Sequence, residues 1–472
     1  MPRFYFIGIG GTAMGAVAIA LARSGATVHG SDQRVYPPMS DALRAAGISW
    51  FEGYDENNLE QGDYDVIVAG NAVSRGNPEV EWALDRRRRL TSLPELVRNE
   101  LIGSGASIVV SGTHGKTTTT SLAAWLLDHA GLQPGFMIGA VPANFNGGCR
   151  VPPIPGAPFV VEGDEYDSAF FDKRSKFVHY RPDIAIVNAI EFDHADIFNS
   201  LDEVKRSFRH MLRLVPRGGL VLARDADANI DAVLDEACCA VERFGFSAHA
   251  DWRIEMLKSS PLDCEFRLHY GGAPYGEFQL PMAGAHNVAN ATAAIAAAQR
   301  LGVSAERAAA ALKQFRPPKR RLELLGVWRG MRVVDDFAHH PTAIRATLNA
   351  LRDSTAGRLL AVFEPRSNTT TRNIFQRELA SAFDQADLVV IAPLNRPDRY
   401  AESERLNLDQ LKQDIEARGP RVFVIPQEAA PDWGVAAQDL LAEHGAAGDL
   451  VAVLSNGAVG GLRQLLIPGD SV

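Results

Sequence analysis

Residues 112–118 (Gly-Thr-His-Gly-Lys-Thr-Thr) combine glycines with a lysine and hydroxyl side chains. A β-branched run (107–110) precedes them and a helix pattern (121–127) follows, which predicts a strand, a tight loop and a helix N-terminus. Backbone N–H groups at such a helix start bind phosphate, and Lys116 would add a full positive charge. The Thr117 hydroxyl would bind Mg²⁺. Two residues separate the glycines instead of the common four, which indicates a variant nucleotide loop. A glycine-rich turn with a solvated lysine is the alternative.

Acidic and amide side chains follow two apolar runs beyond this loop. The run 159–161 leads into Glu-Gly-Asp-Glu-Tyr-Asp at 162–167, and the run 184–187 leads into a polar segment, 188–196. Parallel strands bring their carboxyl ends to one sheet edge, so we expect these side chains beside the glycine loop. Carboxylates that face phosphate need a cation between them, and Mg²⁺ prefers oxygen ligands. Glu165 is therefore the leading candidate ligand. His194 is a second candidate, with a structural histidine as the alternative.

Another glycine-rich turn lies near the start of the chain. The run 4–7 is followed by Gly-Ile-Gly-Gly-Thr-Ala-Met-Gly at 8–15 and an alanine-rich helix pattern, a form of the dinucleotide-binding fingerprint. The run 27–30 ends at Ser31 and Asp32, where an acid commonly binds a ribose hydroxyl. A polar loop, 70–79, follows a further strand. We expect a nucleotide diphosphate or similar anion here; a turn that only packs helix on sheet is the alternative.

Asn287 and Asn290 lie three residues apart at the start of a helix pattern, on one face of its first turn. Two amides there can read the edge of a base, and N-capping is the alternative. The proline-stiffened basic linker 317–323 follows, and it could carry Arg321 over a nucleotide.

A polar loop after the run 359–363 contains Arg366, Ser367 and Asn368. A guanidinium holds a carboxylate with two parallel hydrogen bonds, so Arg366 is a candidate for carboxylate recognition. A surface arginine in an ion pair is the alternative reading of this residue.

The elements that must position these residues alternate between strand and helix. With 472 residues the chain is too long for one core, and we expect three α/β domains with doubly wound sheets. Gly103-Ser104-Gly105 and the linker at 317–323 mark the boundaries. The predicted domains are 1–104, 105–317 and 318–472.

Composition narrows the class of protein. The chain is 46% hydrophobic with a net charge of −9, which argues against binding nucleic acid or an anionic membrane through bulk electrostatics. The four cysteines form no CxxC pair, so a zinc or dithiol centre is not expected. A signal peptide and a membrane-spanning run are not recognisable, and we expect a cytoplasmic enzyme. The sequence leaves the oligomeric state open.

The combination of motifs resembles the Mur ligase superfamily over nearly the whole chain. The residues that carry this resemblance are 112–118, 164–165, 193–194, 286–291 (His-Asn-Val-Ala-Asn-Ala) and 335–341 (Asp-Asp-Phe-Ala-His-His-Pro). The resemblance implies a Rossmann-like UDP-binding domain, a central P-loop-type ATPase domain and a C-terminal Rossmann-like domain for the peptide.

The resemblance further implies an ADP-forming amide ligase of peptidoglycan synthesis that uses ATP and Mg²⁺. Segments such as 36–40, 171–180 and 364–369 favour the branch that joins UDP-N-acetylmuramate to a recycled tripeptide, L-alanyl-γ-D-glutamyl-meso-diaminopimelate. Such an enzyme contributes to cell-wall biogenesis, cell shape and cell division. An acyl phosphate would form and then react with the amine.

By the same resemblance, residues can be given expected roles. Catalysis is expected from Lys116, Glu165 and His194, with Thr117, Glu165 and His194 as metal ligands. ATP is expected at Gly112, Thr113, His114, Gly115, Lys116, Thr117, Thr118, Asn287, Asn290, Arg321 and Asp336. The UDP-sugar is expected at Gly10, Gly11, Thr12, Asp32, Asn71, Ser74 and Asn77. The peptide is expected at His339, His340, Arg366, Ser367 and Asn368.

Some members of the superfamily carry a carbamylated lysine. The corresponding segment here, 204–210, has no lysine at the aligned position, so the carbamate is not expected and Lys205 is only a remote candidate. Three other functions stay open: the L-alanine-adding branch, an ATP-gated module that binds UDP-sugars without ligation, and an NAD-dependent dehydrogenase based on the first glycine turn.

Overall fold

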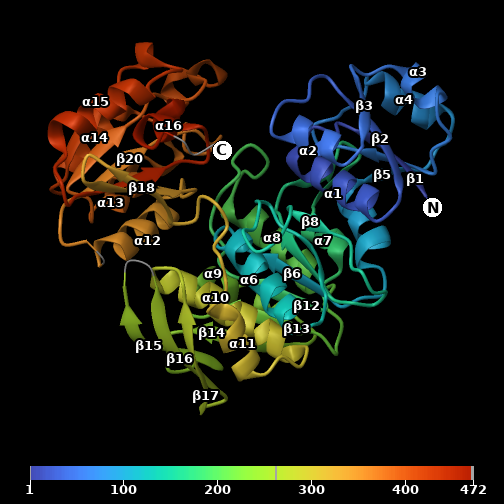
Figure 1. Ribbon diagram of the computed structural model, residues 1–472, viewed down its shortest axis with the longest axis horizontal. Coiled ribbons are helices and arrows are strands. Elements are labelled where there is room, and N and C mark those ends of the chain that lie inside the picture. Colours follow the sequence, from blue (N-terminus) through green and yellow to red (C-terminus); the bar gives the residue numbers. More distant parts are fainter. Residues whose placement is uncertain (1, 261–262, 354, 469–472) are drawn as a thin grey trace.

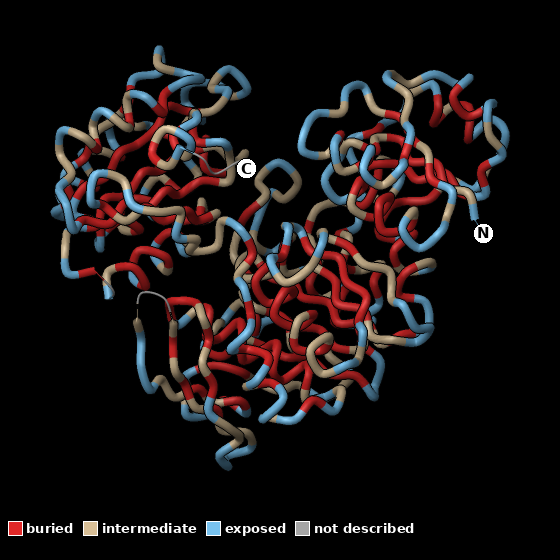
Figure 2. The backbone as a smooth tube through the Cα atoms, in the orientation of Figure 1, coloured by how far each residue is buried: buried red, intermediate tan, exposed pale blue. Residues whose placement is uncertain are grey.

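The apolar runs of the sequence form the buried strands of parallel sheets. The computed structural model describes residues 2–260, 263–353 and 355–468, and the chain forms three α/β lobes (Figure 1). The N- and C-terminal lobes lie on either side of the central lobe, and in each lobe the buried segments include the strands of its sheet (Figure 2). The predicted fold class is confirmed.

The N-terminal lobe contains a parallel sheet in the order β3-β2-β1-β4-β5. Its strands are β1 (Arg3–Ile7), β2 (Thr27–Asp32), β3 (Ser49–Glu52), β4 (Val66–Ala69) and β5 (Leu90–Ser92). Its helices are α1 (Thr12–Arg23), α2 (Met39–Ala45), α3 (Glu56–Glu60), α4 (Pro78–Asp85) and α5 (Leu93–Leu96), followed by a π-helix (Val97–Ile102).

The central lobe contains a ten-stranded sheet in the order β17-β16-β15-β14-β13-β12-β6-β9-β7-β8. Its strands are β6 (Ser107–Ser111), β7 (Gly135–Met137), β8 (Cys149–Arg150), β9 (Phe159–Gly163), β12 (Ile184–Val187), β13 (Leu220–Arg224), β14 (Ala240–Gly245), β15 (Trp252–Ser259), β16 (Cys264–Tyr270) and β17 (Ala273–Leu280). A small hairpin, β10 (Asp167–Ala169) with β11 (Asp172–Ser175), follows β9. The helices are α6 (Lys116–His129), α7 (Phe177–Tyr180), α8 (Leu201–Leu212), α9 (Ala228–Asp231), α10 (Ala285–Arg300) and α11 (Ala305–Leu312).

The C-terminal lobe contains a six-stranded sheet in the order β18-β19-β23-β20-β21-β22, with β18 antiparallel. Its strands are β18 (Glu323–Trp328), β19 (Met331–Asp336), β20 (Leu359–Phe363), β21 (Leu388–Ile391), β22 (Arg421–Val424) and β23 (Leu450–Leu454). Its helices are α12 (Pro341–Arg352), α13 (Gln376–Ala382), α14 (Leu408–Glu416), α15 (Gly434–His444) and α16 (Leu462–Leu466).

The proposed boundaries, 104/105 and 317/318, fall between the last strand of one sheet and the first strand of the next; their exact positions stay a prediction. Strands β13 to β17 were not expected from the sequence. Antiparallel β15–β17 alternate buried and polar positions, as half-buried strands do, and pack against α10 and α11. Every helix in the described part of the chain is too short or too polar to cross a lipid bilayer.

Candidate active site

The glycine loop runs from β6 to the N-terminus of α6 and leaves no room for side chains at its glycines. Gly112 has φ 131° and Gly115 has φ 78°, values that favour glycine. A Cβ on Gly115 would lie 2.5 Å from Oδ1 of Asn290, and one on Gly112 would lie 2.9 Å from the backbone nitrogen of Ala189. The loop is therefore pressed between α10 and the segment after β12, with its helix N-terminus available for phosphate.

Lys116 forms a buried ion pair with Glu165 at the start of α6. Its Nζ donates to Oε2 of Glu165 and to the carbonyl of Gly112, both at 2.7 Å. The side chains are 13% and 3% exposed, respectively, so water screens the pair weakly. Burial alone would lower the pKa of Lys116, but the carboxylates of Glu165 and Asp164 raise it above its ordinary value. Lys116 is therefore a fixed positive charge beside the loop.

Asp164, Glu165 and His194 offer ligand atoms that all lie within 4.8 Å of one another. Oε1 of Glu165 is buried, and within the described residues it has no hydrogen-bond partner. Such an atom needs a donor or a cation, and two carboxylates with an imidazole are a suitable set of ligands for a divalent ion. These residues therefore fit the expected Mg²⁺ chemistry. The sequence also placed Thr117 among the ligands.

In the structure Thr117 connects two domains. Its hydroxyl donates to Oε1 of Glu162 at 3.0 Å and accepts from Nη2 of Arg321 at 3.1 Å. The other oxygen of Glu162 accepts from the backbone N–H of Gly139 at 2.8 Å. Arg321 thus extends from the linker to the glycine loop, in line with the expectation that the linker could carry it over a nucleotide. Glu162 was not among the predicted site residues; its position at the end of β9 is the signal that could have identified it.

Asp336, one of the residues expected to bind ATP, uses its carboxylate within its own domain. It accepts from the N–H groups of Leu322 at 2.7 Å and Ala338 at 2.8 Å, and from the Thr347 hydroxyl at 3.3 Å. Asp336 is 7% exposed. In this conformation the carboxylate orients the linker that carries Arg321, so its contact with ATP stays a prediction.

Asn287 and Asn290 are both buried on the first turns of α10. Nδ2 of Asn287 donates to the carbonyl of Ala283 at 2.8 Å, and Nδ2 of Asn290 donates to Oδ1 of Asn287 at 3.3 Å. The N-cap is Gly284, with no side-chain cap, so neither amide has the capping role considered above. Asn290 instead contacts the glycine loop, and adenine recognition by either amide stays a prediction.

His114 faces the C-terminal domain. Its Nε2 lies 3.2 Å from Oε2 of Glu191, which also lies 3.3 Å from Nδ1 of His340 and accepts from the Thr342 hydroxyl at 2.7 Å. Burial, and next the nearby His114, lower the pKa of His340 to about 3. The His340 side chain is 6% exposed and also caps α12, and His339 bonds to the carbonyl of Phe337. The two histidines expected at the peptide therefore lie where α12 meets the central domain.

A cavity of about 720 Å³ lies over the first glycine turn. Among the predicted UDP-sugar residues, its lining includes Gly11, Thr12, Asp32, Asn71, Ser74 and Asn77. Gly10 lies just outside the lining, and its N–H donates to the Asp32 carboxylate at 2.9 Å. The side chain of Asn77 caps α4.

The same cavity reaches the central domain, because Ser168 and Lys176 also line it. Nζ of Lys176 donates to Asp164 at 2.6 Å, and Asp164 belongs to the cluster with Glu165. The cavity of the N-terminal domain is thus one ion pair away from the carboxylates that face the glycine loop.

Arg366 lies on a unit formed by the loops after β20 and β23. Its Nη1 donates to Oε1 of Glu364 at 3.3 Å, and the hydroxyl of Ser455 donates to the other oxygen of that buried carboxylate. The Arg366 side chain is 39% exposed and passes over Gly457, where a Cβ would collide with it. The guanidinium is therefore held by Glu364 on one side and exposed to a ligand on the other.

Ser367 and Asn368, also expected at the peptide, make contacts inside the protein. The Ser367 and Thr370 hydroxyls lie 2.8 Å apart and close a turn. Nδ2 of Asn368 donates to Asp196 of the central domain at 3.0 Å, and its oxygen accepts from Arg399 and Tyr400. Arg366 and these two residues lie on one loop, but the Asn368 side chain bonds to the central domain and is not free for a peptide in this conformation.

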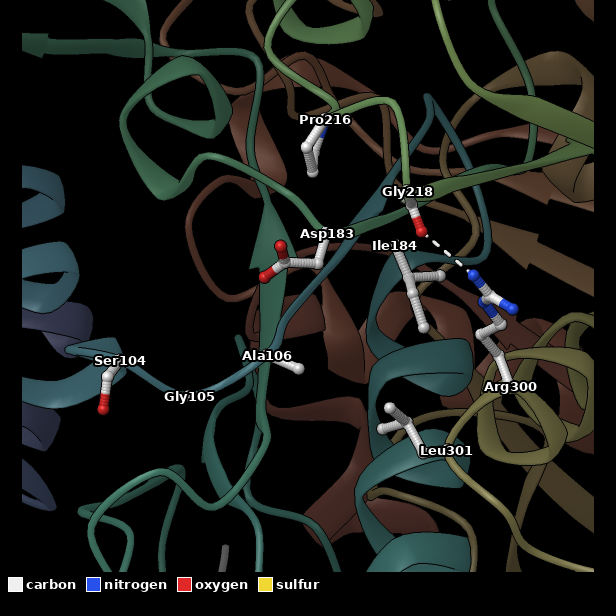
Figure 3. Close-up of a pocket in the computed structure, with 10 residues that line it drawn as sticks. Ser104, Gly105, Ala106, Asp183, Ile184, Pro216, Gly218, Arg300 and Leu301 are labelled. Atoms are coloured by element: carbon white, nitrogen blue, oxygen red, sulfur yellow. Dashed lines mark hydrogen bonds between the residues drawn. The ribbon is translucent and has the colours of Figure 1, made fainter.

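A second cavity, of about 550 Å³, lies at the opposite, amino ends of β6, β12 and β13 (Figure 3). The ionisable residues in its described lining are Asp183 and Arg300. Asp183 accepts from the backbone of Ser107, and Arg300 donates to the carbonyl of Gly218. Both charges are thus used on backbone groups, and ligands of α/β sheets bind at the other strand ends.

Three family models match the chain in succession. They are the Mur ligase family, catalytic domain (residues 3–115), the Mur ligase middle domain (110–298) and the Mur ligase, glutamate ligase domain (320–457). The chain belongs to the Mur ligase family. Members are ATP-dependent amide ligases, and the resemblance inferred from the motifs is confirmed.

Relatives match over most or all of the chain. The UDP-N-acetylmuramate–L-alanyl-γ-D-glutamyl-meso-2,6-diaminoheptandioate ligase of Escherichia coli K12 is 40% identical, over 99% of this chain and 98% of its own. The crystal structure of a murein peptide ligase from Psychrobacter arcticus 273-4 is 35% identical, with a TM-score of 0.70 and complete coverage of both chains. A UDP-N-acetylmuramate–L-alanine ligase of Paenarthrobacter aurescens is 41% identical, over 83% of each chain.

Proposed function

We propose that this Mur ligase joins UDP-N-acetylmuramate to the recycled tripeptide L-alanyl-γ-D-glutamyl-meso-diaminopimelate, with ATP converted to ADP and phosphate. The structural observation that carries the proposal is the pair of linked sites. A nucleotide-sized cavity in one domain reaches, through Lys176 and Asp164, the Lys116–Glu165 pair beside the phosphate-binding loop. The E. coli and P. arcticus relatives support the choice of substrates.

The reaction needs an activated carboxylate, because a free carboxylate is a poor acyl donor. A carboxylate oxygen of the muramoyl group would attack the γ-phosphorus of ATP, and the bond to ADP would break. The amine of the tripeptide would then attack the carbonyl carbon of the acyl phosphate, phosphate would leave, and the amine would lose a proton. These two steps account for the products ADP, phosphate and amide.

The residues would act chiefly by neutralising charge, since the reacting carboxylate and the terminal phosphate repel each other. Lys116 would face the terminal phosphate, and Arg321 would approach it from the linker. Asp164, Glu165 and His194 would hold Mg²⁺, with Thr117 nearby; when bound, that ion supplies positive charge to the phosphate oxygens. Both nucleotide substrates are cytoplasmic metabolites, so we place the enzyme in the cytoplasm.

An isotope experiment tests the chemistry. With ¹⁸O in the muramoyl carboxylate, we expect one labelled oxygen in the released phosphate, and ADP as the nucleotide product. AMP and pyrophosphate, with label in AMP, would instead show acyl-adenylate chemistry and would contradict the role given to Lys116.

The acceptor is tested separately with a panel of amines and phosphate release as the readout. We expect the tripeptide to be used far more efficiently than free L-alanine. Efficient use of L-alanine would favour the L-alanine-adding branch, whose members are also similar to this chain. Binding of the UDP-sugar without turnover of any amine would favour a binding module.

A further inference from the structure

The segment that carries His194 is held in an unusual backbone conformation. His194 has φ 55°, in the left-handed region that is uncommon for residues other than glycine. Its N–H donates to Oδ1 of Asp193 at 2.7 Å, and its carbonyl accepts from the N–H groups of Ile197 and Phe198. In this conformation Nε2 of His194 lies 3.9 Å from Oε2 of Glu165. The direction of the imidazole therefore depends on the Asp193 carboxylate.

That carboxylate is anchored by the C-terminal domain. The hydroxyl of Thr369 donates to Oδ1 of Asp193 at 2.9 Å and accepts from the N–H of Ala195 at 3.5 Å. Thr369 is 2% exposed and Asp193 is 7% exposed. The same oxygen, Oδ1 of Asp193, thus accepts both the Thr369 hydroxyl and the N–H of His194. A hydrogen bond to a buried charged group is among the stronger ones.

Neighbouring contacts attach the same two segments. Asn368 donates to Asp196, and Nη1 of Arg372 donates to the carbonyl of Ala195 at 3.4 Å. Thr369 differs from these residues because its hydroxyl bonds to the carboxylate that fixes the His194 backbone. It also lies three residues beyond Arg366, on a turn closed by Ser367 and Thr370.

We propose that Thr369 is a positioning residue: through Asp193 it fixes the imidazole of His194 against Glu165, so the C-terminal domain completes the cation-binding side of the active site. The proposal rests on the proposed function for the part that His194 plays. The loop expected to bind the peptide thus also shapes the site where the phosphate is transferred.

The test compares Thr369→Val, Thr369→Ser and Thr371→Val. Valine keeps the shape of threonine without the hydroxyl, and serine keeps the hydroxyl. Thr371 is a matched control because it is also 2% exposed, and its hydroxyl donates to the carbonyl of Ser367 within the same loop. Mn²⁺ binding to each full-length enzyme, with a non-hydrolysable ATP analogue present, is measured by electron paramagnetic resonance.

For Thr369→Val we expect the dissociation constant of Mn²⁺ to rise about tenfold, as befits loss of one hydrogen bond to a charged group. The kcat should fall by a similar factor, while KM for UDP-N-acetylmuramate and for the tripeptide changes less than about twofold. Thr369→Ser should restore both values, and Thr371→Val should bind Mn²⁺ as the wild type does.

Unchanged Mn²⁺ affinity in Thr369→Val would overturn the proposal. So would a change confined to the tripeptide KM, which would place Thr369 in the peptide site, or a serine variant as weak as the valine variant. If the valine variant unfolds, Asp193→Asn replaces it, because this change weakens the acceptor of the same hydrogen bond. The serine variant and Asp193→Asn are then compared with Thr371→Val, and Asp193→Asn must weaken Mn²⁺ binding. The Mn²⁺ measurement needs no amine, so its result is independent of which acceptor the enzyme uses.

Discussion

Arg366 shows at the scale of one residue how the environment decides a role. Charge alone did not distinguish a surface ion pair from a ligand-binding group. The structure places a buried partner, Glu364, on one side and leaves the guanidinium partly open on the other. A guanidinium with this exposure can still form two parallel hydrogen bonds to a carboxylate of the tripeptide.

We predict that Arg366→Lys, which keeps the charge but not the fork, raises KM for the tripeptide by about tenfold. The KM values for ATP and UDP-N-acetylmuramate should change little. Steady-state kinetics with each substrate varied in turn checks this. Arg345→Lys is the control, since Arg345 lies on α12 and bonds to Ser381. An unchanged tripeptide KM would remove Arg366 from the peptide site.

At the scale of elements, the glycine loop and helix α6 form a unit that tolerates little change. We predict that Gly115→Ala lowers the free energy of unfolding by about 1–3 kcal/mol because its φ is positive. It should also weaken ATP binding strongly, since the new Cβ would press on Asn290 and Asn188. Thermal denaturation and calorimetric titration with ATP measure the two effects.

Gly131, at the other end of α6, separates the two causes. It has φ 81°, and a Cβ there would have no atom within 4 Å. Gly131→Ala should therefore show the loss of stability from backbone strain and keep the ATP affinity of the wild type. If Gly131→Ala weakened ATP binding as much as Gly115→Ala, crowding at the loop would not be the reason.

Much of the element arrangement was predictable because parallel strands of α/β sheets are uniformly apolar runs, such as 107–110 and 359–363. Among the strands that were not expected, β15 and β16 alternate apolar with polar residues, whereas β13 is an apolar run that was overlooked. The glycine loop, Lys116 and Glu165 were found from local pattern. Glu162 and Glu191 were expected beside the loop only as members of the segments 162–167 and 188–196. Neither they nor Thr369 had an individual role, because their partners are 45 or more residues away and sequence spacing carries no distances.

At the scale of the whole molecule, the two expected nucleotide sites lie in different domains. We predict that Lys116→Ala abolishes ligation, since loss of a charge at the transition state typically costs about 3 kcal/mol or more. Binding of UDP-N-acetylmuramate, measured by calorimetric titration, should stay within about threefold of the wild type, because Lys116 does not line the first cavity.

The variant also leaves Glu165 buried without its cation, which destabilises proteins. Thermal denaturation should therefore accompany the titration, and the double variant Lys116→Ala/Glu165→Gln should recover part of any loss in stability. Loss of UDP-sugar binding in a folded Lys116→Ala protein would refute the separation of the sites.

Acid should destabilise the ligand-free molecule through His286, a half-buried histidine. Burial, and next the charge of Arg224, lower the pKa of His286 to about 4, against an ordinary value of 6.5. Arg321 and His114 also face it and act in the same direction. Between these values the unfolded chain binds a proton that the folded protein does not, so stability falls as pH falls.

We predict a loss of about 1 kcal/mol in the free energy of unfolding per pH unit between pH 6.5 and 4 from His286. Denaturant titrations across this range measure it, and His286→Gln should show a smaller slope than the wild type. Equal slopes in the two proteins would show that His286 does not titrate as described.

The shared support of Arg366 has a consequence for protein engineering. Glu364 bonds to both Arg366 and Ser455, and the Arg366 side chain packs on Gly457. Two loops more than ninety residues apart in sequence therefore form one structural unit. Acceptor preference in such ligases could then be transferred between enzymes only if both contacting loops are exchanged, because one stretch of sequence does not contain the whole unit. A chimera that exchanges residues 364–369 alone would place the new side chain at position 366 against residues 455–457 of the other enzyme. A chimera that also exchanges residues 455–457 would transfer both contacting loops together.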